Sequence, residues 1–274
     1  MMSRQRITSS TIMVALTAFA IINEWFFIAF VIALTAGALY EFFYLVKKKD
    51  IPIYSYVGIF IGILIPLSIF TKFELTKNWE LLFIVLGFLL LLLLQFSRKD
   101  NRNAIIGIST TLFGILYVSW FFSFLVKIRL LIPGIDGARL LAFILLVTKS
   151  ADIGALIIGS RFGKHALIPK ISPKKSAEGW WASLLFGGIT AVLCWPLLPP
   201  EIPYTLASVF FVGVFFGAVG QLGDLSESMI KRDCNVKDSG KLLPGMGGIL
   251  DVIDSLLFSA PAFYLYMSSA LHAT

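Results

Sequence analysis

Residues 81–94 read LLFIVLGFLLLLLL and contain no charged side chain. The whole chain of 274 residues shares this character, because 58% of its residues are hydrophobic and only 14% are charged. Soluble domains are typically about 45–50% apolar and about 25% charged. A water-soluble globule of this size has too little interior to bury so much apolar surface. The composition therefore excludes a soluble enzyme, a nucleic-acid-binding domain and a disordered chain.

A transmembrane helix needs roughly 20 mostly apolar residues, and nine such runs follow one another along the sequence. They predict an all-α polytopic integral membrane protein with about nine transmembrane helices and no separate soluble domain. The runs cover residues 7–22, 25–46, 53–71, 79–96, 104–126, 138–159, 180–198, 205–222 and 249–271.

The first run has some features of a cleaved signal peptide. Arg4 and Arg6 precede it, and Ala18-Phe19-Ala20 resembles a signal-peptidase site. We expect this run to be retained as the first helix. Its cleavage would leave the orientation of all later runs unchanged.

The distribution of Lys and Arg predicts the orientation, since cytoplasmic loops carry an excess of both. With a cytoplasmic N-terminus, most of the 23 basic residues fall on the cytoplasmic side. The opposite side holds only Lys72, Lys77, Lys127, Arg129 and Arg139. The sequence thus predicts an N-terminus inside and a C-terminus outside. The net charge of +7 suits an anionic lipid surface or anionic substrates, and we expect no nucleic acid partner.

Polar residues concentrate in the second half of the chain. Two long loops, at about 160–179 and 223–248, are predicted on the cytoplasmic side and are rich in Gly, Lys, Ser and Asp. Long loops in a compact membrane protein are more often functional than idle. We therefore expect residues 1–135 to form a scaffold of five helices, with dimerisation as a further role. Residues 136–274 would form four catalytic helices with the two loops.

Asp251 and Asp254 open the last run, three residues apart and so on one face of a helix. Two neighbouring carboxylates repel each other unless a cation lies between them. Mg²⁺ is commonly held by one or two carboxylates together with substrate phosphates. This pair predicts a metal site, and the alternative is a pair of helix-start acids favoured by the macrodipole.

Asp224 ends the eighth run. If the helix continues, Asp224, Glu227 or Ser228, and Lys231 share one face. Such a carboxylate beside basic residues suits a metal with bound phosphate, although a solvated helix end explains it equally well.

The two loops contain further candidates. Gly-rich backbone beside Lys, as in residues 237–248, can cradle phosphate oxygens just before a helix N-terminus. The lysines, hydroxyls and carboxylate of residues 172–178 are suited to clamp a triphosphate, whereas a positive-inside loop explains the lysines alone. Lys149 and Asp152, three residues apart within a run, either serve the site or neutralise each other.

His and Cys chemistry is not expected. His165 and His272 are the only histidines and fall on opposite sides of the membrane in this topology. Cys194 and Cys234 build neither a disulfide framework nor a CxxC motif.

A long pattern in the last third of the chain resembles the signature of phosphatidate cytidylyltransferases, also called CDP-diacylglycerol synthases, of the bacterial type. It reads Ser228-x-Ile230-Lys231-Arg232-x4-Lys237-Asp238-x-Gly240-x2-Leu243-Pro244-x-Met246-Gly247-Gly248-Ile249-x-Asp251-x-Ile253-Asp254. A second block, from Asp152 to Gly179, resembles a further stretch of bacterial members. The sequence departs from the family pattern at Met246, where His is usual, and at Val252, where Arg is usual.

The resemblance implies a nucleotidyltransferase that transfers the cytidylyl group of CTP to phosphatidic acid, releasing pyrophosphate, in phospholipid biosynthesis. It implies Mg²⁺ as cofactor, with a monovalent cation as a second candidate, a homodimer among membrane lipids, and a site facing the cytoplasm from the inner membrane. The expected catalytic residues are Asp224, Asp251, Asp254, Lys231 and Arg232. The expected metal ligands are Asp224, Asp251 and Asp254, with Asp152 as a further candidate. The expected substrate-binding residues are Ser172, Lys174, Lys175, Ser176, Glu178, Ser228, Lys237, Asp238, Gly247 and Gly248.

Three other functions compete with this reading. A CTP-dependent lipid kinase of related architecture would release CDP instead of pyrophosphate. The residues Asp136-Gly137-Ala138-Arg139 echo part of the CDP-alcohol phosphatidyltransferase motif, but its later acids are absent. An ion-coupled transporter could also place acids within its spans, but it would predict broken helices at the midplane and paired repeats, whereas this chain gathers its polar residues at the cytoplasmic rim.

Overall fold

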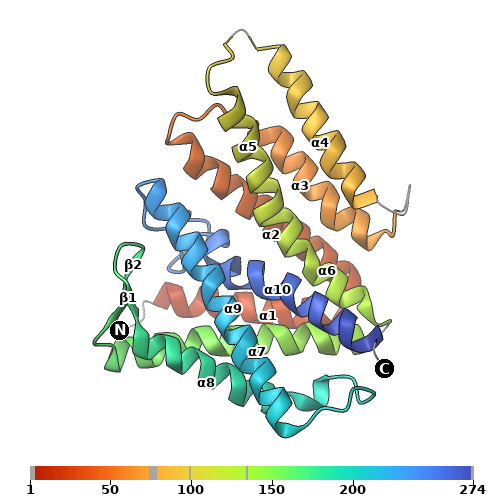
Figure 1. Cartoon of the computed structure of the whole chain (residues 1–274), viewed down its shortest axis with the longest axis vertical. Coiled ribbons are helices and arrows are strands. Elements are labelled where there is room, and N and C mark those ends of the chain that lie inside the picture. Colours follow the sequence, from red (N-terminus) through yellow and green to blue (C-terminus); the bar gives the residue numbers. More distant parts are fainter. Residues whose placement is uncertain (1–3, 74–78, 99, 134, 273–274) are drawn as a thin grey trace. The chain divides into compact units, whose positions relative to one another are not determined.

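A computed structural model describes residues 4–73, 79–98, 100–133 and 135–272. The chain divides into two compact units, Met1–Val126 with Cys234–Asp251 and Lys127–Asp233 with Val252–Thr274. Figure 1 shows the elements of both units in the order of the sequence. The scaffold and catalytic roles expected for residues 1–135 and 136–274 remain predictions.

The predicted apolar runs are helical throughout the described part of the chain. The elements before residue 132 are α1 (Arg4–Ile22), α2 (Glu24–Lys47), α3 (Ser55–Phe70), α4 (Trp79–Phe96), α5 (Ala104–Gly114), the π-helical segment η1 (Ile115–Trp120) and α6 (Phe121–Leu131). The later elements are α7 (Ile135–Phe162), β1 (Ala166–Ile168), β2 (Ser172–Ser176), α8 (Ala177–Leu193), the 3-10 turn η2 (Trp195–Leu197), α9 (Leu206–Asp233) and α10 (Ile249–His272).

Six helices among the described residues are long and apolar enough to cross a membrane. They are α1, α2, the continuous stretch from α5 to α6, α7, α9 and α10. The other three predicted spans correspond to α3, α8 and α4, which have 16, 17 and 18 residues. The structure therefore supports a multi-pass helical membrane protein, with six long candidate spans among the described residues. A total of nine spans and the orientation of the termini remain predictions.

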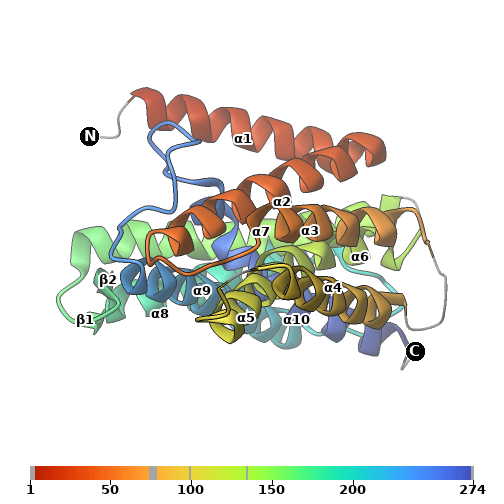
Figure 2. The same cartoon turned by 90° about the horizontal axis from the view of Figure 1, so that it is seen from above.

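In the first unit, α2 and α3 lie side by side (Figures 1 and 2). The polar break before α2 is a helix cap, because the Asn23 side chain accepts a hydrogen bond from the backbone N–H of Phe26. Side chains such as Leu39, Phe42 and Phe43, each at most 1% exposed, form the buried face of α2. A buried carboxylate, Glu41, lies among them.

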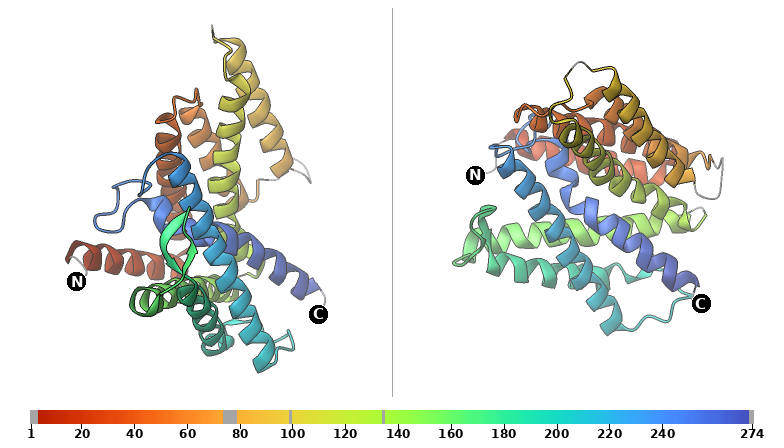
Figure 3. Two further views of the ribbon diagram at one scale, coloured as in Figure 1. Left: turned by 60° about the vertical axis from the view of Figure 1, so that its left-hand side comes forward. Right: turned by 45° about the horizontal axis from the view of Figure 1, so that its top comes forward.

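In the second unit, α9 crosses α7 and α8, which lie side by side (Figure 3). In the core, the ring of Phe143 stacks on that of Phe263, and Phe216 meets Phe263 edge-to-face with the two centroids 5.2 Å apart. This packing fixes α7, α9 and α10 relative to one another within the unit.

Two details differ from the sequence prediction. First, α9 continues to Asp233, so residues 223–233 are helical and not the start of a loop. Second, β1 and β2 form a short antiparallel hairpin within the first predicted loop of this otherwise helical chain. Both elements carry residues that were expected to act in the site.

Candidate active site

The extension of α9 carries a row of polar side chains on one face. Gln221, Asp224, Glu227, Ser228 and Lys231 recur at intervals of three and four residues, the spacing that places helical side chains on one side. All are buried except Asp224, which is half-buried. The continuation of α9 beyond residue 222 is the condition under which the sequence predicts this shared face, and the structure meets it.

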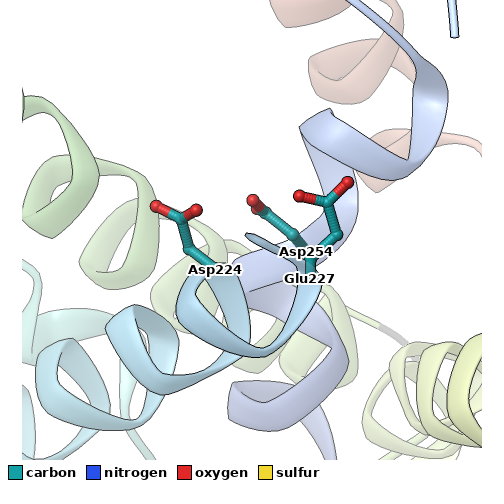
Figure 4. A group of neighbouring side chains, drawn as sticks. All are labelled: Asp224, Glu227 and Asp254. Atoms are coloured by element: carbon teal, nitrogen blue, oxygen red, sulfur yellow. The ribbon is translucent and has the colours of Figure 1, made fainter. Parts of the chain in front are cut away.

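Three carboxylates meet where α9 approaches α10. Oxygen atoms of Asp224, Glu227 and Asp254 all lie within 4.8 Å of one another. Figure 4 shows the group, with Asp224 and Glu227 on α9 and Asp254 on α10. The approach requires Gly223, because a Cβ atom there would lie about 2.5 Å from the backbone oxygen of Asp254. An oxygen-only donor set of this kind suits a hard divalent cation such as Mg²⁺.

Two lysines neutralise part of this charge. Lys175 Nζ lies 2.6 Å from Asp224 Oδ2, and Lys231 forms an ion pair with Glu227 one turn away on α9. Asp254 and Glu227 are almost fully buried, at 7% and 0% exposure. Burying charges is costly unless they are paired, so this cluster is expected to bind cationic groups.

Lys149 and Asp152 form the pair that their spacing predicted. Lys149 Nζ lies 3.2 Å from Asp152 Oδ2 and donates hydrogen bonds to Ser255 Oγ at 2.8 Å and to the Val252 carbonyl at 2.9 Å. Gln221 Nε2 donates to Asp152 Oδ1 at 3.2 Å. This network connects α7 to α9 and α10 beside the carboxylates, and Asp152 also lines the adjoining cavity.

A cavity of about 510 Å³ opens beside Asp224 in the second unit. Lys174, Lys175 and Ser176 of β2 line this cavity, together with Trp180 of α8. The complete lining is Asp152, Ala155, Leu156, Gly159, Ser160, Leu167, Lys174, Lys175, Ser176, Gly179, Trp180, Gln221 and Asp224. This lining combines two lysines, hydroxyls and acids with apolar side chains, which suits a ligand that has a phosphate and an apolar part.

The hairpin is held by residues that the sequence assigned to substrate. Ser176 is the N-cap of α8 and accepts from the Gly179 N–H at 3.1 Å. Glu178 accepts from the N–H groups of Lys164 and His165 and lies 2.7 Å from His165 Nδ1. The hydrogen bond with His165 lowers the pKa of Glu178 to about 2. These contacts order the loop, and direct substrate binding by Ser176 and Glu178 remains a prediction.

Arg232 contributes to the same ordering. Its Nε donates to the Ile171 carbonyl at 3.1 Å, which ties the end of α9 to the turn of the hairpin. Ser172 lies on β2, although it is not among the residues that line the cavity.

The glycine-rich loop belongs to the first unit, where Asp251 organises it. Asp251 Oδ2 accepts from Ser239 N at 3.0 Å, Ser239 Oγ at 2.9 Å and Gly248 N at 2.7 Å. Asp251 is not a member of the metal-type carboxylate group found among the described residues, whereas Glu227 is. Lys237 and Asp238 are exposed on this loop. Their roles, and metal binding by Asp251, remain predictions.

Two acids are missing from the site that the sequence predicts. On the face of α9 the sequence gives Glu227 only as an alternative to Ser228, whereas the approach of α10 brings Glu227 to Asp254. The predicted site does not include Glu41, although a single acid in the middle of an apolar run is a signal for function.

A model of the cytidylyltransferase family matches residues 4–270. The chain belongs to the cytidylyltransferase family.

Several relatives share its length. The phosphatidate cytidylyltransferase of Synechocystis sp. is 35% identical over 295 residues, covering 97% of both chains. The Bacillus subtilis protein of the same name is 30% identical over 272 residues, also covering 97% of both. A protein of Escherichia coli K12, YnbB, named as uncharacterized, is 35% identical over 255 residues, covering 89% of this chain and 80% of its own.

This membership confirms the resemblance drawn from the motifs. The structure also shows the contacts of Met246 and Val252, the two residues that depart from the family pattern. In this cytidylyltransferase, Met246 Sδ accepts a hydrogen bond from Ser10 Oγ at 3.5 Å. The side chain of Val252 carries no charge, but the backbone carbonyl of Val252 accepts a hydrogen bond from Lys149 Nζ. A lysine thus contacts the backbone at the position where the family pattern usually has Arg.

Proposed function

We propose that this chain is a phosphatidate cytidylyltransferase, which transfers the cytidylyl group of CTP to phosphatidic acid and gives CDP-diacylglycerol and pyrophosphate. Full-length relatives with this name support the proposal. The observation that carries it in the structure is the cavity beside Asp224, lined by Lys174 and Lys175, next to three converging carboxylates.

In the proposed reaction, an oxygen of the lipid phosphate attacks the α-phosphorus of CTP. A new P–O bond forms while the bond between the α-phosphorus and its bridging oxygen to the β-phosphate breaks, and pyrophosphate leaves. The attacking phosphate monoester is already anionic, so the chain needs no nucleophile of its own. Its residues then have to position two anions and offset their repulsion, as in other phosphoryl transfers.

The residues of the site suit those tasks. Lys174 and Lys175 bring positive charge to the cavity from the hairpin. The Lys149–Asp152 pair and Gln221 fix the neighbouring helices, so that the carboxylates keep their positions. We propose that Asp224, Glu227 and Asp254 hold Mg²⁺, with Asp251 as the remaining candidate from the sequence. A bound Mg²⁺ would supply electrostatic stabilisation of phosphate charge.

We further propose that the site faces the cytoplasm from the inner membrane, with the N-terminus inside and the C-terminus outside. The excess of Lys and Arg in the corresponding segments supports this orientation. Assembly as a homodimer and binding of a second, monovalent cation are proposed on the family resemblance alone.

The test is an assay in detergent micelles with CTP labelled in the cytidine, phosphatidic acid, and Mg²⁺ present or removed. We expect label in the lipid phase and an equal amount of pyrophosphate, both dependent on Mg²⁺. Release of CDP with phosphorylated lipid would instead identify a lipid kinase. Intact CTP with folded protein would contradict both activities.

A further inference from the structure

Glu41 is a buried acid on α2 that no part of the proposed mechanism uses. Only 2% of its surface is exposed, and apolar residues precede and follow it in Leu39-Tyr40-Glu41-Phe42-Phe43. An ionisable group inside an apolar helix is costly and usually has a specific partner. Its partners lie about 200 positions later in the sequence, within the same compact unit.

One carboxylate oxygen of Glu41 holds the segment that precedes α10. Glu41 Oε2 accepts from Ser239 Oγ at 3.1 Å and from Leu250 N at 2.9 Å. Leu250 is in the first turn of α10, where backbone N–H groups lack partners within the helix. A negative charge at this position also interacts favourably with the helix dipole.

The Ser239 hydroxyl connects Glu41 to Asp251. Ser239 Oγ lies 3.1 Å from Glu41 Oε2 and 2.9 Å from Asp251 Oδ2. A serine hydroxyl has one hydrogen to donate, so the two carboxylates share it. A displacement of Glu41 would therefore change the hydrogen bonding of Asp251.

The glycine-rich loop is shaped around the Glu41 carboxylate. A Cβ atom at Gly240 or at Gly248 would overlap the carboxylate atoms of Glu41. Within the described residues, Glu41 Oε1 makes no hydrogen bond. The loop thus encloses the carboxylate on both sides of Ser239, and it has no room for a larger residue at either glycine.

We propose that Glu41 is a positioning residue for cytidylyl transfer. By fixing Ser239 and the first turn of α10, it sets the conformation of residues 237–250 and the orientation of Asp251. The proposal rests on the proposed function and on the sequence prediction that this loop and Asp251 serve the phosphates and the metal. Glu41 itself contacts no reacting atom.

The test compares Glu41→Ala, Glu41→Gln and Ser239→Ala with a matched control, Thr35→Ala. Thr35 is also fully buried on α2, and its hydroxyl donates to the Val31 carbonyl of the same helix. Each protein is purified in detergent, and the folded fraction is measured by size-exclusion chromatography. The kcat and KM values for CTP are then expressed per folded enzyme.

We expect Glu41→Ala to lower kcat/KM about 10- to 100-fold, the range for losing hydrogen bonds to a charged group. Glu41→Gln should restore most of this loss, because its amide oxygen can accept the same two hydrogen bonds. Ser239→Ala should lower kcat/KM, and Thr35→Ala should leave it unchanged. Equal kcat and KM per folded enzyme in Glu41→Ala and Thr35→Ala would overturn the proposal, because Glu41 would then serve stability alone.

A second measurement does not depend on activity. Lys237 and Lys241 are exposed on the loop, so trypsin cleavage after them reports the order of the loop. We expect Glu41→Ala to be cleaved there about ten times faster than Thr35→Ala, with unchanged cleavage after Lys170. Equal rates would overturn the positioning role even if the wild-type protein proved inactive. An inactive wild-type protein with this difference in cleavage would contradict only the proposed function.

Discussion

Lys175 Nζ lies 2.6 Å from Asp224 Oδ2 and joins the β-hairpin to α9 at the edge of the cavity. Because Lys175 lines the cavity while its ammonium group contacts Asp224, we expect the ammonium to exchange part of this contact for a phosphate oxygen when an anion binds. Both side chains are less than one third exposed, which limits screening by solvent.

Replacing Lys175 should impair binding or turnover of CTP. We expect Lys175→Ala to lower kcat/KM for CTP about 10- to 100-fold, since a charged hydrogen bond to phosphate is lost. The measurement is steady-state kinetics with labelled CTP in mixed micelles. Lys170→Ala, at an exposed position in the turn of the same hairpin, should stay within about twofold of the wild type. Equal losses in both variants would contradict a specific role for Lys175.

The carboxylate cluster predicts which acids bind the metal. We expect Glu227→Gln and Asp254→Asn each to raise the Mg²⁺ concentration for half-maximal activity at least about tenfold, because each removes one charged ligand. Direct titration with Mn²⁺, followed by electron paramagnetic resonance, should show the same weakening without turnover. Asp136→Asn removes an exposed acid that pairs with Arg139 at 2.9 Å, and it should change neither value.

The same experiment separates Glu227 from Asp251. Asp251 Oδ2 is occupied by three donors of its own loop, so Asp251→Asn should weaken Mn²⁺ binding less than Glu227→Gln does. The reverse order would show that Asp251 is a stronger ligand than Glu227, in keeping with the sequence prediction that placed Asp251 among the metal ligands.

Glu178 should titrate well below an ordinary glutamate. The hydrogen bond with His165 lowers its pKa to about 2 from 4.5. The contribution of Glu178 to the order of the hairpin is therefore complete above about pH 4.5 and is lost as the pH falls toward 2. The Glu178 carboxyl carbon, observed by NMR in detergent and identified by its absence in Glu178→Gln, should show this low midpoint. A midpoint near 4.5 would contradict the hydrogen bonds to Lys164 and His165.

The orientation can be tested with two single cysteines on exposed positions. In a background with Cys194 and Cys234 replaced by Ser, Lys164→Cys should react with an impermeant maleimide only in inside-out vesicles. Lys72→Cys should react only in right-side-out vesicles. Labelling of both after permeabilisation is the control. The opposite pattern would reverse the proposed topology.

The helices were predictable because their signal is local. Most apolar runs, such as residues 25–46, form a helix close to the expected ends, since backbone groups in an apolar environment must pair within the segment. The end of α9 was missed because the polar residues 224–233 lower its hydropathy. A helix can leave the apolar region and continue where one face is buried by protein.

The candidate site was predictable only in part. The sequence predicts Asp224 and Asp254, but the contribution of Glu227 depends on how closely α10 approaches Gly223. The role of Ser176 as a cap and of Glu178 as an acceptor depends on the turn of the hairpin. Such contacts are set by packing in three dimensions, and no spacing rule along one helix contains them.

The distance in sequence between Glu41 and its partners has a consequence for biogenesis. Ser239 lies 198 residues after Glu41, and Leu250 lies 209 residues after it. During synthesis, α2 is therefore made long before the groups that satisfy its carboxylate exist. The first unit cannot complete its polar interior until the ribosome has passed residue 250. A prematurely terminated product would leave this acid without Ser239 and Leu250 in an apolar helix, a state that membrane quality control can recognise.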